Sequence, residues 1–405
     1  MTRRLVNTIF IIIFIAIVGF FTGCNQTEKN DYFVASYYFP NYHIDKRNEQ
    51  VHGAGWSEWE LVKNAKPRFE GHQQPHVPLW GYTDEANPVD MAQKINAASD
   101  HGIDAFIFDW YYYNDGLYLE RGLEDGFMKA ANNDRMKFAL MWANHDWIDI
   151  HPMSLNKKAE LLYPGTISPE VFEKMTDYVI ETYFKHPSYW KINNRPYFSV
   201  YDLQKLLESF GSVEKCREAL DRFREKTRQA GFDGLSLNAV IWGNPILPGE
   251  NKPADLVKLV HELGFDNATS YVWIHHARLE QFPQTPYNEA KKQYFDFVEK
   301  ATREYDIPYF PNLTMGWDAS PRCNQTDDFI RKGYPFMATL SGNTPEEFRK
   351  AAEELREMVA EKPVDERIIT INCWNEWTEG SYLEPDTKNG FRYLKALKDV
   401  LKTDF

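Results

Sequence analysis

The chain has 405 residues, of which 43% are hydrophobic and 15% aromatic, enough to form the core of one large globular domain or two ordinary ones. A formal net charge of -13 and a pI near 5.4 argue against nucleic acid or an anionic membrane surface as a partner, because both select clustered Lys and Arg. We therefore expect a neutral ligand and no nucleic acid. The 12 Trp, 23 Tyr and 27 Phe suit the C–H faces of sugars, and an aromatic-rich core explains them equally well.

The N-terminal segment has the pattern of an export signal. A basic start (MTRR) is followed by an apolar run (LVNTIFIIIFIAIVGF) and by a small residue before Cys24. This ending predicts a bacterial lipoprotein signal over 1–24, with Cys24 lipidated as a membrane anchor, a short tether over 25–32 and an exported protein in the periplasm or on the cell surface. Phe21 departs from the pattern, because Leu is usual there. An uncleaved transmembrane anchor is the alternative, since the run is nearly long enough to span a bilayer.

Eight short apolar runs follow, and helical patterns separate them. The runs cover residues 34–40, 105–113, 137–145, 195–202, 235–243, 267–273, 309–317 and 368–377. Eight strands that alternate with helices predict an α/β fold, a (β/α)8 TIM barrel, as a single catalytic domain over 33–405. A doubly wound sheet is the alternative, because it too places its ligand at strand ends.

Two of the intervening segments contain residues that are typical of helix boundaries. Asn87 and Pro88 have the pattern of an N-cap and a first helical residue, and Gly102 stands where that helix must end. Thr344, with Glu three residues later, predicts a capping box and a helix over 345–362. Both helices are expected to lay one apolar face on the sheet.

Polar and aromatic residues gather at the ends of the runs, where a barrel carries its active site. We take as candidate substrate-binding residues Tyr38, Trp59, Asp109, Tyr111, Trp142, Asn144, His145, Trp317, Trp374, Asn375 and Tyr382. Each also has a structural explanation, as a packed ring or a hydrogen-bonded strand end. Trp59 lies in the long segment after the first strand. Glu58 beside it is a candidate substrate-binding carboxylate, and a surface salt bridge is the favoured interpretation.

The segment NCWNEWTEGSYLEPD (372–386) contains the strongest catalytic candidates, Glu376 and Glu379. Residues three apart on a helical turn have Cβ atoms about 5 to 6 Å apart on one face. Two carboxyls that close favour a retaining glycosidase, since an inverting pair stands roughly 6.5 to 9.5 Å apart. Mutual repulsion and the flanking indoles should raise one pKa, which leaves one acid and one base. A helix cap or an arginine pair is the structural alternative.

This segment is very similar to the hallmark of the WbsX-like family, and further motifs extend the resemblance. They include YYFPNYH (37–43), GWSEWELVKNAKPRFEGHQQPHVPL (55–79), WANHDW (142–147) and HPSYWKINNRPYF (186–198), so the resemblance covers nearly everything from 33 to about 398. The family is related to the family 99 endo-α-mannosidases, which are retaining (β/α)8 enzymes with two glutamates in an E-x-x-E turn. The resemblance implies that Glu376 is the base toward the sugar's own 2-hydroxyl and that Glu379 is the general acid and later base.

Two segments depart from the pattern of the family. His145 and Asp146 stand where many relatives have Glu and Asn, and FDWYYY (108–113) replaces an HYW-type segment. His145 and Asp146, with Asp149 and His151, lack any recognised metal-ligand spacing, so we expect neither a metal nor another cofactor. The remaining cysteines allow at most one disulfide and are expected to be buried packing residues: Cys216, Cys323 and Cys373.

The leading expectation is therefore an exported, retaining glycoside hydrolase that cleaves a polysaccharide or glycan. A glycosyltransferase of polysaccharide biosynthesis is the second possibility, although the chain contains no pair of aspartates at DxD spacing and an exported enzyme would not meet nucleotide sugars. A non-catalytic carbohydrate-binding lipoprotein is the third. Binding alone explains the aromatic residues, but it does not need both Glu376 and Glu379.

Overall fold

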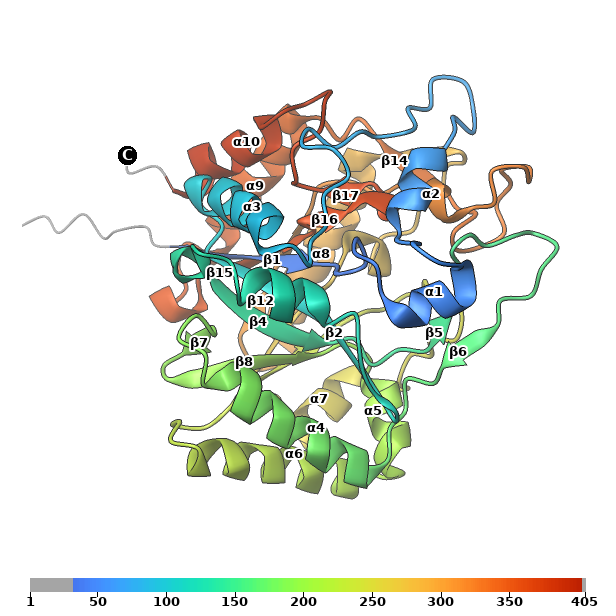
Figure 1. Ribbon diagram of the computed structural model, residues 1–405. Helices are drawn as coiled ribbons and strands as arrows, with labels where there is room; N and C mark the ends of the chain where they lie inside the picture. The colour runs from blue at the N-terminus through green and yellow to red at the C-terminus, as the bar shows by residue number, and fades with distance from the viewer. Residues whose placement is uncertain (1–31, 403–405) are drawn as a thin grey trace, which may run out of the picture.

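The computed structural model describes residues 32–402, and a closed barrel of eight parallel strands lies at its centre (Figure 1). The barrel strands are, in chain order, β1 (Phe33–Tyr38), β2 (Ala105–Tyr113), β4 (Lys137–Trp142), β8 (Arg195–Val200), β9 (Ser236–Val240), β10 (Asn267–Thr269), β12 with its continuation β13 (Tyr309–Phe310 and Asn312–Thr314) and β15 (Ile368–Asn372). Each pairs in parallel with the next, and β15 also pairs with β1, which closes the barrel. The TIM-barrel prediction is confirmed, and the doubly wound alternative is excluded.

The strands are buried along nearly their whole length, as expected for parallel strands with helices outside and a filled barrel inside. Part of the interior is polar. The hydroxyl oxygens of Thr269 on β10 and Thr370 on β15 lie 3.0 Å apart, although these strands are not neighbours. Ser199 on β8 donates to Oδ1 of Asn238 on β9 at 2.7 Å. Hydrogen bonds between strands therefore satisfy these four buried side chains.

Helices follow the strands and form the outer layer. They are α3 (Pro88–Asp100) after β1, the short π-helix η1 (Gly122–Phe127) after β2, α4 (Pro169–Val179) after β4, α5 (Leu203–Phe210) and α6 (Val213–Gln229) after β8, α7 (Leu256–Leu263) after β9, α8 (Tyr287–Glu304) after β10, α9 (Pro345–Val359) after β13 and α10 (Arg392–Leu401) after β15. In Figure 1, α3, α9 and α10 lie above the strands, and α4 and α6 lie below them.

The two predicted helix starts are confirmed. The side chain of Asn87 accepts from the backbone N–H of Val89 at the start of α3. The side chain of Thr344 accepts from the backbone N–H of Glu347 at the start of α9. Only this half of the capping box forms, because the carboxylate of Glu347 bonds to Asn288 and Lys350 instead. Helix α9 ends at Val359, three residues before the predicted end.

The longest connecting segments begin at the carboxyl ends of the strands and contain short helices and strands of their own. Helices α1 (Lys46–His52) and α2 (Trp59–Asn64) follow β1, and the strand pair β5 and β6 (Trp147–Ile148 and Leu161–Tyr163) follows β4. These elements lie together at one end of the barrel in Figure 1. The remaining short strands are β3 (Gly116–Tyr118), β7 (Lys191–Ile192), β11 (Gln284–Pro286), β14 (Thr339–Ser341), β16 (Asn375–Glu376) and β17 (Ser381–Tyr382).

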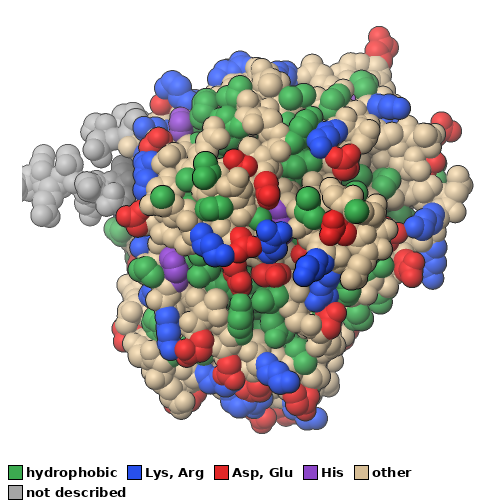
Figure 2. Space-filling view, viewed as in Figure 1, with side chains coloured by type: hydrophobic (Ala, Val, Ile, Leu, Met, Phe, Trp, Pro, Cys, Tyr) green, Lys and Arg blue, Asp and Glu red, His purple; other side chains and the backbone are tan. Residues whose placement is uncertain are grey.

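The predicted export signal, lipidated Cys24 and most of the tether lie outside the described residues and stay predictions. Between residues 32 and 402, no helix is long and apolar enough to cross a membrane. The three cysteines in this range are buried and free, as predicted. On the face in Figure 2, acidic and basic side chains are interspersed.

Candidate active site

Glu376 and Glu379 lie directly after β15, as the sequence predicts. Glu376 belongs to β16, and Glu379 ends the 3-10 turn η7 (Trp377–Glu379). Gly380 then adopts φ 61°, and a Cβ atom here would lie 2.7 Å from Cβ of Asp318, so this position requires glycine. The close approach of the two segments holds both carboxyl groups in a buried turn at the mouth of the barrel.

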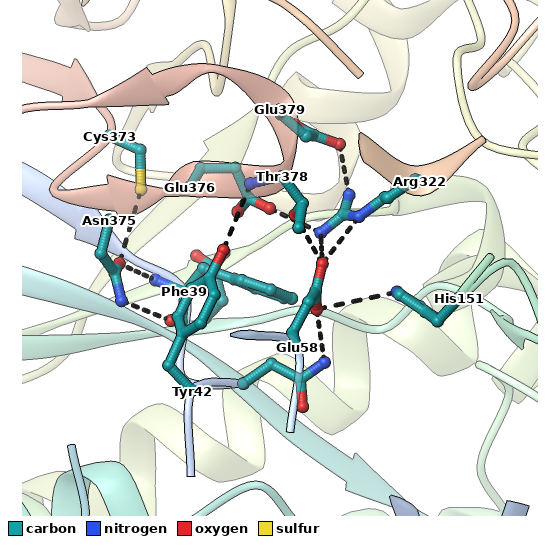
Figure 3. Close-up of polar contacts among 12 residues, drawn as sticks. Phe39, Tyr42, Glu58, His151, Arg322, Cys373, Asn375, Glu376, Thr378 and Glu379 are labelled. Atoms are coloured by element: carbon teal, nitrogen blue, oxygen red, sulfur yellow. Dashed lines mark hydrogen bonds and ion pairs between the residues drawn. The ribbon is translucent and has the colours of Figure 1, made fainter. Parts of the chain in front are cut away.

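A single guanidinium group contacts both carboxyls (Figure 3). Nη2 of Arg322 lies 2.6 Å from Oε1 of Glu376, and Nη1 lies 2.6 Å from Oε1 of Glu379. The hydroxyl of Tyr334 donates to the same oxygen of Glu379 at 2.7 Å and accepts from Nη1 of Arg322. Arg322 ends the turn η5 (Ser320–Arg322) in the loop after β13, so the loops after the last two barrel strands build this contact together.

A third carboxyl, that of Glu58 at the start of α2, also contacts this guanidinium group, and the four charged residues Glu58, Arg322, Glu376 and Glu379 form one cluster. Oε1 of Glu58 lies 2.7 Å from Nη2 of Arg322 and accepts from the hydroxyl of Thr378 at 2.5 Å. Its Oε2 accepts from the side-chain amide of Asn41 at 2.6 Å and lies 3.8 Å from Nε2 of His151. Glu58 is fully buried, so the expected surface salt bridge is instead an internal one.

The pKa values of the cluster follow from burial and from Arg322. Burial raises the pKa of Glu376 well above its usual range and also raises that of Glu379, although Arg322 works in the opposite direction on both. For Glu58, burial is outweighed by Arg322, His151 and the Thr378 hydroxyl, so its pKa is lowered. Glu58 is therefore the ionised partner of Arg322, and the carboxyls of Glu376 and Glu379 retain a proton more readily.

Asp109 in the middle of β2 adds a further carboxyl to this group. The hydroxyl of Tyr271 donates to Oδ2 of Asp109 at 2.8 Å and lies 3.4 Å from Oε2 of Glu376. Oδ1 of Asp109 is buried and has no hydrogen-bond partner among the described residues. Burial raises the pKa of Asp109 well above its usual range. Asp109 is thus placed to contact a bound hydroxyl group.

These residues line one side of a pocket that encloses about 610 Å³, measured to its open mouth. Its polar lining includes Asp109, Tyr271, Arg322, Glu376 and Glu379. Such a pocket, mostly apolar with a few convergent polar groups, is typical of sites for small molecules or for one unit of a polymer.

Three of the predicted substrate-binding residues line this pocket, and they are Asp109, Tyr111 and His145. The others lie outside it and are Tyr38, Trp59, Trp142, Asn144, Trp317, Trp374, Asn375 and Tyr382. His145 is half-buried and donates from Nδ1 to the carbonyl oxygen of Asp146 at 3.0 Å, and desolvation lowers its pKa. Its imidazole is therefore neutral near pH 7.

Successive side chains of a strand point to opposite faces, which explains why Tyr38 and Trp142 lie outside the pocket. Tyr38 packs against Phe106 and Phe108, whereas the preceding Tyr37 has its ring centroid 4.7 Å from that of Tyr271 in the site. Trp142 likewise packs against Phe172 of helix α4, and the preceding Met141 lines the pocket. The ring of Trp374 also lies outside the pocket, with its centroid 5.2 Å from that of Phe106.

The two asparagines hold loops in place. Asn144 donates to the carbonyl of Asp202 at 2.7 Å and accepts from its N–H at 2.8 Å. Asn375 does the same for Phe39, accepting from its N–H at 2.8 Å and donating to its carbonyl at 2.7 Å. Because Phe39 lines the pocket, Asn375 acts on the pocket through the backbone that it fixes.

The remaining aromatic candidates lie on the far side of the catalytic turn. Trp59 packs between Tyr42 and Trp377, and its indole N–H donates to the carbonyl of Thr83 at 2.8 Å. Trp317 and Tyr382 line a second hollow of about 1160 Å³. Between residues 32 and 402, no group of three or more His, Cys, Asp or Glu side chains is arranged to hold a metal ion.

The sequence did not single out Arg322, Tyr271 or Tyr334. Tyr271 lies within the predicted strand run 267–273, whose last residue, Trp273, packs against Tyr294 of helix α8. Arg322 lies only a few residues beyond the predicted seventh strand. A basic residue so near a strand end was the available signal.

Comparison with known proteins places these features in a family. A family model described as glycosyltransferase WbsX matches residues 34–397. Two proteins of Xanthomonas campestris pv. campestris, both described as uncharacterized protein WxcX, are 26% and 25% identical over an alignment of 390 residues that covers 91% of this chain and 49% of each relative. The chain thus spans about half the length of the curated relatives it matches.

The fold is shared with solved glycoside hydrolase structures. A glycoside hydrolase-like protein superposes with a TM-score of 0.58 at 15% identity, over 92% of this chain and 95% of that chain. The GH99 endo-alpha-mannosidase from Bacteroides thetaiotaomicron superposes with a TM-score of 0.50 at 16% identity, over 91% of this chain and 96% of that chain. The fold and the family are those of carbohydrate-active enzymes, and the chain belongs to the WbsX family.

Proposed function

We propose that this protein is a glycoside hydrolase that cleaves a polysaccharide or glycan with retention of configuration at the anomeric carbon. The observation that carries the proposal is the bridging of Glu376 and Glu379 by one guanidinium group, with contacts of 2.6 Å to each. Two carboxyls within reach of one side chain favour the short separation of retaining enzymes, about 5 to 5.5 Å, over the wider gap that admits a water.

The roles of the two glutamates are those that the resemblance to E-x-x-E enzymes implies. Glu379, whose pKa burial raises, gives its proton to the glycosidic oxygen as the bond to the leaving group breaks. Glu376 acts in its ionised form, which Arg322 stabilises, and takes the proton of the sugar's 2-hydroxyl. The oxygen of that hydroxyl attacks the anomeric carbon and gives an anhydro-sugar.

The second half of the reaction restores both carboxyls. Glu379, now ionised, takes a proton from water, whose oxygen attacks the anomeric carbon and opens the anhydro ring. Glu376 returns its proton to the 2-oxygen. Two inversions at the same carbon give net retention. Arg322 stabilises whichever glutamate is ionised at each stage, because it contacts both.

The experiment compares residues 25–405 with the Glu376→Gln and Glu379→Gln variants on a panel of plant, fungal and bacterial polysaccharides. Glu346→Gln is the matched control, because Glu346 is an exposed residue at the start of α9. Chromatography should detect sugars released by the wild type and the control, and a loss of at least 10³-fold in both pair variants. Release that survives both changes would contradict the proposal.

A glycosyltransferase is the second candidate, and the description of the family model favours it. Nucleotide sugars would then bind and raise the melting temperature of the protein. We expect no shift with UDP-, GDP- or dTDP-linked sugars, and a shift of several degrees would favour the transferase. Export as a lipoprotein remains part of our proposal, because the pattern of residues 1–24 supports it.

A further inference from the structure

We infer that the pocket accepts a sugar unit that presents a methyl group, either as C6 of a 6-deoxyhexose or within an acetyl substituent. The inference rests on the proposed function, since it concerns the sugar bound beside Glu376 and Glu379. It comes from the aliphatic side chains that line the pocket together with Glu376, Glu379 and Arg322.

Six aliphatic side chains line the pocket, and together we call them the aliphatic wall. They are Met141, Ala143, Ile148, Ile150, Leu247 and Pro248. They come from three separate parts of the chain: the end of β4, the segment that contains β5, and the loop between β9 and α7. A pyranose ring carries hydroxyl groups around its edge, so this wall faces part of the sugar without offering hydrogen bonds.

Two polar side chains that line the same pocket, Asp146 and Tyr201, already have partners in the protein. Asp146 accepts from the N–H of Gly165 at 2.8 Å and from Nζ of Lys205 at 2.9 Å. The hydroxyl of Tyr201 donates to Oε1 of Glu250 at 2.7 Å. A sugar hydroxyl placed against the aliphatic wall would therefore lose its bonds to water without replacement.

The aliphatic wall is held in place before any ligand binds. Oε2 of Glu250 accepts from the backbone N–H groups of Ile246 at 2.6 Å and Leu247 at 2.9 Å. Gly249 adopts φ 93°, and a Cβ atom there would lie 3.2 Å from Oδ2 of Asp146, so this loop packs tightly on the segment after β4. These contacts fix Leu247 and Pro248 at the pocket, and a methyl group finds an apolar surface already formed.

Matched sugars that differ only at the relevant group test this inference. The probes are L-fucose and L-galactose, L-rhamnose and L-mannose, 6-deoxy-D-glucose and D-glucose, and 6-O-acetyl-D-glucose and D-glucose, all of which keep the 2-hydroxyl. Binding is measured by calorimetry and by saturation-transfer NMR on the Glu376→Gln/Glu379→Gln double variant of residues 25–405, a protein that contains the whole described barrel. The 6-deoxy pairs and the acetyl pair separate the two sources of the methyl group.

We expect at least one methyl-bearing sugar to bind about 10- to 100-fold more tightly than its partner, with the strongest saturation transfer at its methyl protons. Leu247→Asn and Ile148→Thr, two changes at half-buried positions, should each reduce this preference at least fivefold. Leu279→Asn is the control, because Leu279 is also half-buried but does not line the pocket.

Equal or tighter binding of every hydroxylated partner, or no binding by any methyl-bearing sugar, would overturn the inference. A methyl preference that survives both changes to the aliphatic wall would overturn it as well. Because the double variant needs no turnover, the result is independent of hydrolysis. A methyl preference without hydrolysis by the wild type would reject the proposed function alone, and hydrolysis without the preference would reject this inference alone.

Discussion

Arg322 and Glu58 form a buried ion pair in which Nη2 of Arg322 lies 2.7 Å from Oε1 of Glu58, and the side chains are 5% and 0% exposed. Glu58 therefore neutralises part of the charge that Arg322 presents to Glu376 and Glu379. The position of the proton on the catalytic pair depends on a residue that touches neither glutamate directly. Glu58 and Arg322 thus act as positioning residues with opposite effects on the pair.

The first prediction concerns Glu58→Gln. The negative charge of Glu58 raises the pKa of both Glu376 and Glu379, and Arg322 lowers them. Without that charge both pKa values fall, so both limbs of the pH profile of kcat/KM should move roughly one unit toward lower pH. Glu346→Gln should leave the profile unchanged. A profile of Glu58→Gln that coincides with the wild type would show that Glu58 has only a structural role.

The second prediction concerns Arg322→Met, which should move both limbs of the profile in the opposite direction, toward higher pH. Loss of the guanidinium should also reduce kcat/KM by 10²-fold or more and lower the free energy of unfolding by about 3 to 5 kcal/mol, because Glu58 is left buried and unpaired. Adding Glu58→Gln to this variant should recover most of the stability but not the activity. Recovery of both would contradict a direct role for Arg322 at the pair.

The third prediction concerns Tyr271→Phe. The change removes the hydroxyl that donates to Asp109 at 2.8 Å and lies 3.4 Å from Glu376. The pKa of Asp109 should rise, because burial already raises it and the lost hydrogen bond opposed that effect. We expect kcat/KM to fall about tenfold and the free energy of unfolding to change by about 1 kcal/mol. Tyr305→Phe, at a buried tyrosine outside the pocket, should not alter kcat/KM.

The fourth prediction concerns stability and pH at Glu250, whose pKa burial raises from 4.5 to about 7. A raised carboxyl pKa contributes stability below the unfolded value of about 4.5, and this contribution is lost as the pH rises through about 7. The free energy of unfolding of Glu250→Gln, relative to that of the wild type, should therefore increase by on the order of 3 kcal/mol between pH 4.5 and 7. Above pH 7 this difference should stay constant. Urea denaturation at pH 5, 6, 7 and 8 measures the difference, which the exposed Glu280→Gln should not reproduce.

Hydrophobic patterning was sufficient to predict the barrel because parallel strands are buried on both faces and appear as short apolar runs. For the same reason, the sequence pattern does not show which side chains of a strand face the site. A strand without polar and apolar alternation does not distinguish Tyr37 from Tyr38, or Met141 from Trp142. Tyr38 and Trp142 were the predicted substrate-binding residues, and the rings of both pack outside the pocket.

The position of Glu376 and Glu379 could be predicted because both belong to one segment at one strand end. Arg322 and Glu58 could not, because Arg322 contacts Glu376 across 54 residues of sequence and Glu58 contacts Thr378, which lies between the two glutamates, across 320. Only the closed barrel brings the loops after its first, seventh and eighth strands together. Loop contacts of this kind carry no periodic signal in the sequence.

The most direct test of the central claim is proton NMR of the first product released by the wild type from the polysaccharide that it cleaves. The proposed chemistry of Glu376 and Glu379 predicts that the newly formed reducing end first appears with the anomeric configuration of the substrate and only later mutarotates. First appearance of the opposite anomer, or product formation that persists in both Glu376→Gln and Glu379→Gln, would contradict the account.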